Sequence, residues 1–173
     1  FSVAAAFTLL LGANALGELF YQSTQASRYI ALLAPLVPVM YMDSVVDAHL
    51  KGLGYQVYAM GVNIADAAVS VLCVLLFVSR FGADGYVYVI YIAECLNFAF
   101  SFGKMKRLTK PSLRLRDVAL PVLVGGSAFL FVRLSMVESI SALSFLLRGG
   151  SFLLCFTIGL LILKRPKAEA APL

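Results

Sequence analysis

Carboxylate and amide side chains on three consecutive apolar segments are the residues of this sequence that could do chemistry. They are Asp43 and Asp47, then Asn63 and Asp66, then Glu94 and Asn97. The members of each pair are three or four residues apart, so on a helix they share a face. Charged groups inside otherwise apolar helices are costly and usually functional. These six residues are therefore the candidates for binding a substrate or an ion.

Depth along the helices brings these side chains to overlapping heights. At about 1.5 Å per residue, Asp43 lies roughly 12 Å, Asp66 roughly 17 Å and Glu94 roughly 14 Å from the same expected side of the bundle. A short aspartate at such a depth must pair, be protonated or line a wet cavity. We therefore expect the three polar faces to meet one another or a shared cavity, and a functional or cavity role for Asp66 and Glu94.

Structural explanations stay open for the other side chains. Asp47 and Lys51 can form an i,i+4 ion pair at the water boundary. Asn97 can simply hydrogen-bond across helices, as polar residues in membrane bundles do. His49 is the single histidine, and we expect it at the interface rather than as a ligand or a proton relay.

The composition indicates an integral membrane protein. Hydrophobic residues make up 61% of the 173 residues and charged residues 13%, with a mean hydropathy of +0.92. In soluble domains about 45–50% of the residues are hydrophobic and about 25% are charged. A domain of this size keeps much of its surface wet, so the excess cannot be buried. The net charge of +5 gathers at segment ends, so no nucleic-acid partner is indicated. Cys73, Cys95 and Cys155 are expected to be packing residues.

Six segments have the roughly 20 mostly apolar residues that a membrane helix needs. They cover residues 1–21, 29–50, 55–79, 85–103, 118–137 and 141–163. The sequence thus predicts an all-α, polytopic membrane helix bundle over residues 1–163 and a basic cytoplasmic tail at 164–173. Pro35 and Pro38 should kink or loosen the second helix. The start inside an apolar helix suggests a fragment of a longer protein.

Basic residues predict the orientation. The turn at 51–54, the linker at 104–117 and the tail fall on one side, which then holds ten basic residues against four. The ten are Lys51, Lys104, Lys106, Arg107, Lys110, Arg114, Arg116, Lys164, Arg165 and Lys167, and the four are Arg28, Arg80, Arg133 and Arg148. Basic loops are cytoplasmic, so we expect a multi-pass protein of the cell membrane with a cytoplasmic C-terminus. The role of Arg133, Glu138 and Arg148 stays open, with an Arg148–Glu138 pair or snorkelling as the default.

Enzyme signatures are absent from this sequence. It has no nucleotide-binding loop, no paired-histidine metal motif and no nucleophile elbow. No linker exceeds the 14 residues of 104–117, which leaves no room for a catalytic domain. We therefore expect neither enzyme activity nor a metal site, and transport is the default function of a bundle lined with polar residues.

Three runs of residues resemble one family. They are Tyr41–Asp47 with Leu50–Gly54, Val62, Asn63 and Asp66; then Phe81–Tyr86; then Tyr91–Asn97. Over about residues 29–107 the chain resembles the stage V sporulation protein B family, polysaccharide-biosynthesis flippases of the MATE-like (MOP) superfamily. The resemblance is weak in the last two helices.

The resemblance implies fourteen helices in two lobes that work by alternating access. It implies transport of lipid-linked oligosaccharides, including peptidoglycan precursors, across the cytoplasmic membrane. The chain looks like helices nine to fourteen, the C-terminal portion of that fold, so its implied partners are the bilayer, the lipid-linked saccharide and the missing N-terminal lobe. Arginines that meet the substrate pyrophosphate lie largely in the missing lobe. No bound cofactor is expected; because some members bind sodium in the second lobe, Na⁺ or H⁺ coupling through Asn63 and Asp66 stays open.

Three functions therefore compete. The first is a flippase of lipid-linked saccharides. The second is a cation-coupled, MATE-type exporter of small amphipathic compounds. The third is a non-transporting membrane scaffold subunit for envelope or spore-coat synthesis, in which the polar faces would pair off and leave no cavity.

Overall fold

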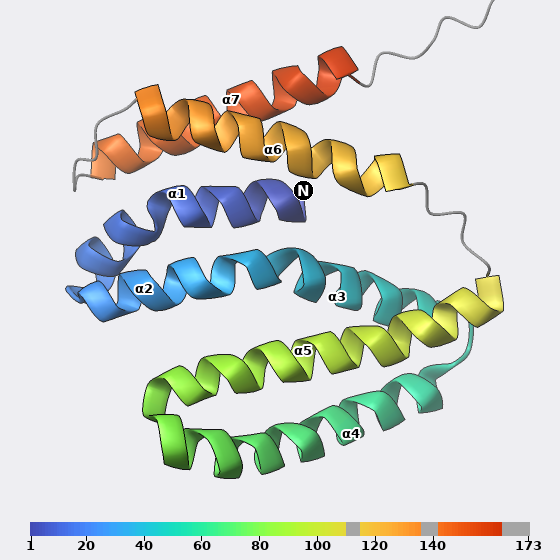
Figure 1. The fold of residues 1–173 in the computed structure, drawn as a ribbon. Helices are drawn as coiled ribbons and strands as arrows, with labels where there is room; N and C mark the ends of the chain where they lie inside the picture. The colour runs from blue at the N-terminus through green and yellow to red at the C-terminus, as the bar shows by residue number, and fades with distance from the viewer. Residues whose placement is uncertain (110–114, 136–141, 164–173) are drawn as a thin grey trace, which may run out of the picture. The chain divides into compact units, whose positions relative to one another are not determined.

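The computed structural model describes residues 1–109, 115–135 and 142–163, which form helices joined by short turns with no strand among them (Figure 1). The all-α class predicted from the sequence is confirmed. Within these residues, five helical stretches are long and apolar enough to cross a membrane. They are Ser2–Tyr21, Thr24–Gly52, Gln56–Thr109, Val118–Ser135 and Phe145–Leu163. Such helices are typical of a multi-pass membrane protein.

The helices form two compact units. The first unit contains α1 (Ser2–Tyr21), α2 (Thr24–Leu33) as far as Ile30, α6 (Leu115–Ser135) and α7 (Ala142–Leu163). The second contains the end of α2, the 3₁₀ turn η1 (Ala34–Leu36), α3 (Val37–Gly52), α4 (Gln56–Cys73), the π-helical turn η2 (Val74–Val78) and α5 (Ser79–Thr109).

Small residues on α1 allow close packing in the first unit. A Cβ on Gly17 would overlap Ser27 of α2, and a Cβ on Gly125 of α6 would lie 2.7 Å from the Phe7 ring. Phe7 also contacts the Phe152 ring of α7, with the centroids 6.1 Å apart. The buried core of this unit comprises Ala4, Val124, Ala128, Val132, Phe152 and Phe156. Close backbone approach through small residues is the usual way in which membrane helices associate.

In the second unit, α5 packs against both α3 and α4. The turn between α3 and α4 contains Gly54 at φ 85°, a backbone conformation that glycine adopts without strain. Gly82, at φ 59° and ψ −137°, is non-helical and reverses the chain, so that α4 and α5 run antiparallel (Figure 1). On α4, Val57, Met60 and Ile64 are three or four residues apart and are 80%, 59% and 62% exposed. This outward apolar face is what a lipid-facing surface requires.

Two expected linkers are shorter than predicted. The chain from 22 to 28 is a turn only at its start, because α2 begins at Thr24. The Ser23 hydroxyl accepts a hydrogen bond from the Ala26 backbone N–H at 3.5 Å, which is the pattern of an N-cap. The linker expected at 104–117 also shortens, since α5 continues to Thr109 and α6 begins at Leu115.

The prolines loosen their helix as predicted. Pro35 lies inside the 3₁₀ turn η1 and Pro38 lies in the first turn of α3, and the continuous helical stretch still runs from Thr24 to Gly52. A 3₁₀ segment within a longer helix is a common consequence of a missing backbone donor.

Arg148 is buried in α7, with 8% of its surface exposed. Its predicted partner Glu138 lies outside the described residues, as does the tail at 164–173. Arg133, at the end of α6, lies with its guanidinium carbon 6.0 Å from the centroid of the Phe129 ring. This contact is an ordinary cation–π interaction.

Candidate functional site

A hydrogen bond between two of the candidate residues joins α3 to α5. The Asn97 Nδ2 donates to the Asp43 Oδ2 at 3.1 Å. The other side-chain oxygens of this pair, Asp43 Oδ1 and Asn97 Oδ1, are buried and have no hydrogen-bond partner in the part of the chain that the structure describes. The pair thus joins two helices, and each of its side chains keeps one oxygen that can accept a hydrogen bond from a ligand.

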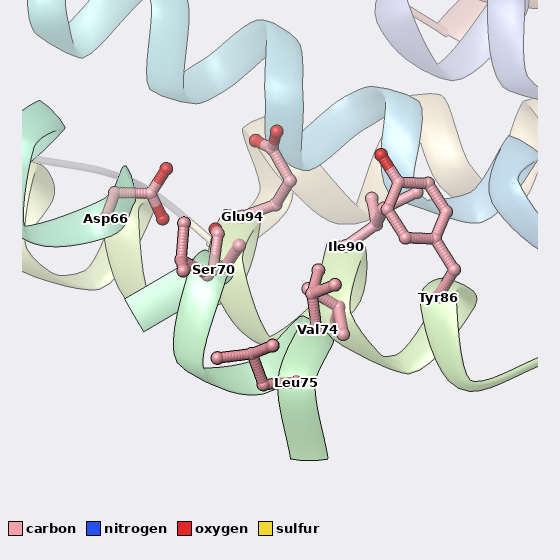
Figure 2. Close-up of a pocket in the computed structure, with 10 residues that line it drawn as sticks. Asp66, Ser70, Val74, Leu75, Tyr86, Ile90 and Glu94 are labelled. Carbon is pink, nitrogen blue, oxygen red and sulfur yellow. The ribbon is translucent and has the colours of Figure 1, made fainter. Parts of the chain in front are cut away.

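A pocket of about 340 Å³ lies between α4 and α5 (Figure 2). Its polar lining comes from Asp66 and Ser70 on α4 and from Tyr86 and Glu94 on α5. The apolar lining residues are Val71, Val74, Leu75, Val89, Ile90 and Ala93. Figure 2 shows the carboxylates of Asp66 and Glu94 coming from neighbouring helices onto the same pocket. The Asp66 Oδ1 is buried and without a hydrogen-bond partner among the described residues.

Carboxylates from α3, α4 and α5 lie close together in this unit. Asp43 and Asp66 both lie close enough for their charges to act on Glu94. Asp47 and Asp66 act in the same way on Asp43. Three helices therefore contribute acidic groups to one cluster, as the overlapping heights along the sequence predict. Like charges that are gathered in an apolar surrounding are costly unless a ligand, a proton or water compensates them.

Of the six candidates only Asp66 and Glu94 line the pocket, and Asp47 and Asn63 belong neither to it nor to the hydrogen-bonded pair of Asp43 and Asn97. Asp47 pairs with Lys51, with 2.6 Å between its Oδ2 and the lysine Nζ, which is the simple i,i+4 ion pair among the open explanations. Asn63 is exposed and does not line the pocket. It shares a side of α4 with Ser70 but lies about 10 Å from it along the helix axis. Since the pocket extends from Asp66 towards the reversal at Gly82, Asn63 is at the wrong end of α4 to reach it.

Two tyrosines outside the six candidates also have a role in this unit. Tyr86 lines the pocket, and its spacing of four from Ile90 and eight from Glu94 could have placed it on that face. Tyr91 donates from its hydroxyl to the Leu32 carbonyl at 2.6 Å. This bond fastens α5 to the turn of helix just before the two prolines, in the way that neighbouring side chains support proline-containing membrane helices.

The π-helical turn η2 also has no counterpart in the predictions. Val74 and Leu75, at its start, form part of the pocket wall. A Cβ on Gly85 would collide with the Phe77 carbonyl, so glycine permits the close approach of η2 and α5. π-helical turns inside α-helices are frequent at functional sites. The wide turn therefore helps to shape the pocket end nearest to Gly82.

Among the side chains that the structure describes, no group of three or more His, Cys, Asp or Glu residues is arranged to hold a metal ion. His49 is exposed near the end of α3. The groups present are instead suited to accept hydrogen bonds from a ligand, because carboxylate and amide oxygens offer several lone pairs each.

No family model matches this chain, and no curated protein and no solved structure is significantly similar to it. The family resemblance over residues 29–107 therefore stays a prediction. The functional proposal rests on the geometry of the second unit.

Proposed function

We propose that the chain is part of a membrane flippase that moves lipid-linked saccharides by alternating access. The observation that carries the proposal is the pocket of about 340 Å³ on which Asp66 and Glu94 converge inside an otherwise apolar unit. Asp43 and Asn97 add a hydrogen-bonded pair on the neighbouring faces of α3 and α5. Polar side chains buried among membrane helices commonly mark the path of a substrate.

A saccharide fits the chemistry of this pocket. Its hydroxyl and amide groups are donors, and the carboxylate oxygens of Asp66 and Glu94 are acceptors. The Asp66 Oδ1 is buried and has no hydrogen-bond partner among the described residues. The Ser70 and Tyr86 hydroxyls can donate as well as accept. Val89, Ile90 and the neighbouring wall residues supply the apolar surface against which a sugar ring or a lipid chain can pack.

The linking phosphate groups of such a substrate would have to lie elsewhere. The clustered charges of Asp43, Asp66 and Glu94 would repel a pyrophosphate. We therefore assign the saccharide, and not the pyrophosphate, to this pocket. Basic residues of the absent N-terminal lobe would hold the pyrophosphate, in agreement with what the family resemblance implies.

Six membrane spans follow from this proposal when the stretch Gln56–Thr109 is divided at Gly82. As one straight helix its 54 residues would be about 81 Å long, whereas the hydrocarbon core is about 30 Å thick. With six spans, the ten-to-four distribution of basic residues supports a cytoplasmic C-terminus and a cytoplasmic turn at 51–54. The membrane in question would be the cytoplasmic membrane.

A cation-coupled exporter of small amphipathic compounds is the second candidate. It is favoured by one observation: Asp43, Asp66 and Glu94 lie close together, and Lys51 is paired with Asp47 and so does not neutralise them. A Na⁺ ion, a proton or a cationic amphiphile would relieve that repulsion. The scaffold hypothesis has less support, because acceptor atoms of Asp43, Asp66 and Asn97 are buried without a partner among the described residues.

A transport assay on the full-length protein in vesicles tests the proposal. Vesicles are loaded with a lipid-linked saccharide precursor, and its appearance in the opposite leaflet is measured. The double variant Asp66→Asn, Glu94→Gln should slow transport at least about tenfold, the equivalent of about 1.4 kcal/mol. Asn63→Ala, outside the pocket on the same helix, is the matched control. Equal rates in all three proteins would contradict the proposal, and a dependence on cations with no saccharide transport would favour the exporter.

A further inference from the structure

The lysine near the end of α5 is held between two aromatic rings. The Lys104 Nζ lies 5.0 Å from the centroid of the Tyr55 ring and 5.1 Å from that of the Tyr58 ring. Tyr55 precedes the first residue of α4 and Tyr58 lies in its first turn. Distances of this size are typical of cation–π contacts. One ammonium group is therefore placed by two rings of the neighbouring helix.

A hydrogen bond holds one of the two rings, that of Tyr58. The Tyr58 hydroxyl donates to the Phe100 carbonyl at 3.1 Å. Phe100 lies one helical turn before Lys104 on α5, so the same tyrosine contacts α5 at two successive turns. The lysine side chain consequently has less freedom to lose when its ammonium group binds a ligand, and this preorganisation favours binding.

The basic charges here are not paired by any acidic side chain that the structure describes. Among those side chains, no carboxylate forms an ion pair with Lys104, Lys106 or Arg107. Lys51, at the α3 end of the same unit, differs because Asp47 holds it at 2.6 Å. Lys104 and Arg107 are three residues apart and lie on one side of α5, whereas Lys106 points to the opposite side of the helix.

The length of α5 locates these charges relative to a membrane. After the kink at Gly82 the helix continues for 27 residues, from 83 to 109, or about 40 Å, which exceeds the hydrocarbon thickness of about 30 Å. Counted from Gly82, about 20 residues fill the hydrocarbon, so the helix emerges near Lys104. Tyr55 and Tyr58 then lie at the level of the lipid headgroups, where tyrosines are enriched in membrane proteins.

We propose that Lys104 and Arg107, with Tyr55 and Tyr58 placing the lysine, bind the headgroup phosphate of an anionic membrane phospholipid. The charges are complementary, and clusters of basic side chains at the ends of membrane helices are the usual binding sites of anionic headgroups. The source of the phosphate is a lipid and not a soluble ion, because the charges emerge where the helix leaves the hydrocarbon. The inference is independent of the transported substrate.

Retention of lipid by the purified full chain tests this site. The chain is reconstituted in nanodiscs of mixed phosphatidylglycerol and phosphatidylcholine, then released into detergent, and the bound lipids are counted by native mass spectrometry. We expect a preference for phosphatidylglycerol that falls about fivefold in Lys104→Gln, since one basic residue near an anionic surface contributes about that factor. Lys104→Arg should keep the preference, and Tyr55→Leu with Tyr58→Leu should weaken it.

Two matched controls separate this site from general surface charge. Lys106→Gln removes the same charge at the same height on the opposite side of α5, and Lys51→Gln removes a lysine that Asp47 already engages. Both should leave the preference within about twofold of the parent protein. An equal loss in Lys104→Gln and Lys106→Gln, no preference for phosphatidylglycerol in the parent, or displacement of the lipid by excess inorganic phosphate would each overturn the proposal. Circular dichroism of every variant confirms that the helices are intact.

Discussion

Asn97 and Asp43, which are 54 residues apart in the chain, are joined by a hydrogen bond of 3.1 Å between α5 and α3. The bond brings together two of the polar faces that define the candidate site. It also leaves one acceptor oxygen on each side chain buried without a partner among the described residues. The pair is therefore both a structural link between helices and a possible contact for a ligand.

The energetic coupling of this pair can be measured by a double-mutant cycle. Asp43→Ala and Asn97→Ala should each destabilise the second unit, and the double variant should lose less than the sum. Interhelical hydrogen bonds in membranes contribute about 0.6 kcal/mol on average and at most about 1.7 kcal/mol, so we expect a coupling in that range. Unfolding of the purified chain in mixed micelles measures it. Strict additivity would show that the two side chains do not interact in solution.

The hydroxyl of Tyr91 should stabilise the proline-containing part of the α2–α3 helix. Tyr91→Phe removes the donor to the Leu32 carbonyl and nothing else. Backbone amides near η1 should then exchange hydrogen faster, by a factor of about five for a hydrogen bond of about 1 kcal/mol. Tyr88→Phe is the control, because that side chain is exposed and packs its ring on Phe81. Unchanged hydrogen exchange around η1 in Tyr91→Phe would show that the Tyr91 hydroxyl does not stabilise this segment.

A glycine is required where the chain reverses between η2 and α5. Gly82 has φ 59° and ψ −137°, a combination that side chains with a Cβ strongly disfavour. Gly82→Ala should destabilise the α4–α5 hairpin by about 1–3 kcal/mol. Gly103→Ala, on the same helix with nothing within 4 Å of the added Cβ, should be neutral or slightly stabilising. Thermal unfolding in detergent distinguishes the two, and equal melting temperatures would mean that another backbone conformation serves equally well.

The first unit offers a test of close packing between α1 and α2. A Cβ at Gly17 would overlap backbone and side-chain atoms of Ser27, which cannot simply rotate away. Gly17→Ala should therefore destabilise the chain by about 1–3 kcal/mol. Gly61→Ala on α4 meets nothing within 4 Å and should have no such effect. Comparable stability of the two variants would contradict the packing described for α1.

Sequence periodicity could predict the helices and the level of the polar groups. Hydrophobic length locates spanning helices within a few residues, and a spacing of three or four places Asp43, Asp66 and Glu94 at one level. The i,i+4 pair of Asp47 and Lys51 is local and needs only the helix to form. These features depend on residues that are near one another in the chain.

Contacts between helices could not be predicted in the same way. The exclusion of Asn63 from the pocket depends on where α5 crosses α4, and the bond from Tyr91 to Leu32 depends on the height of α5 against α2. The π-helical turn depends on how the chain approaches Gly82. The start of α2 was misplaced for a different reason: polar residues from Gln22 to Arg28 resemble a loop, although Ser23 caps a helix there.

Accessibility of the pocket wall is the most direct test of the central claim, that α4 and α5 enclose a wet, ligand-binding pocket. In the full-length protein with Cys73, Cys95 and Cys155 replaced by serine, Ser70→Cys on the wall is compared with Leu72→Cys on the exposed apolar face. We predict rapid reaction of Ser70→Cys with a cationic methanethiosulfonate reagent, protection by a lipid-linked saccharide, and slow, unprotected reaction of Leu72→Cys. Equal, unprotected reaction rates at the two positions would contradict the account.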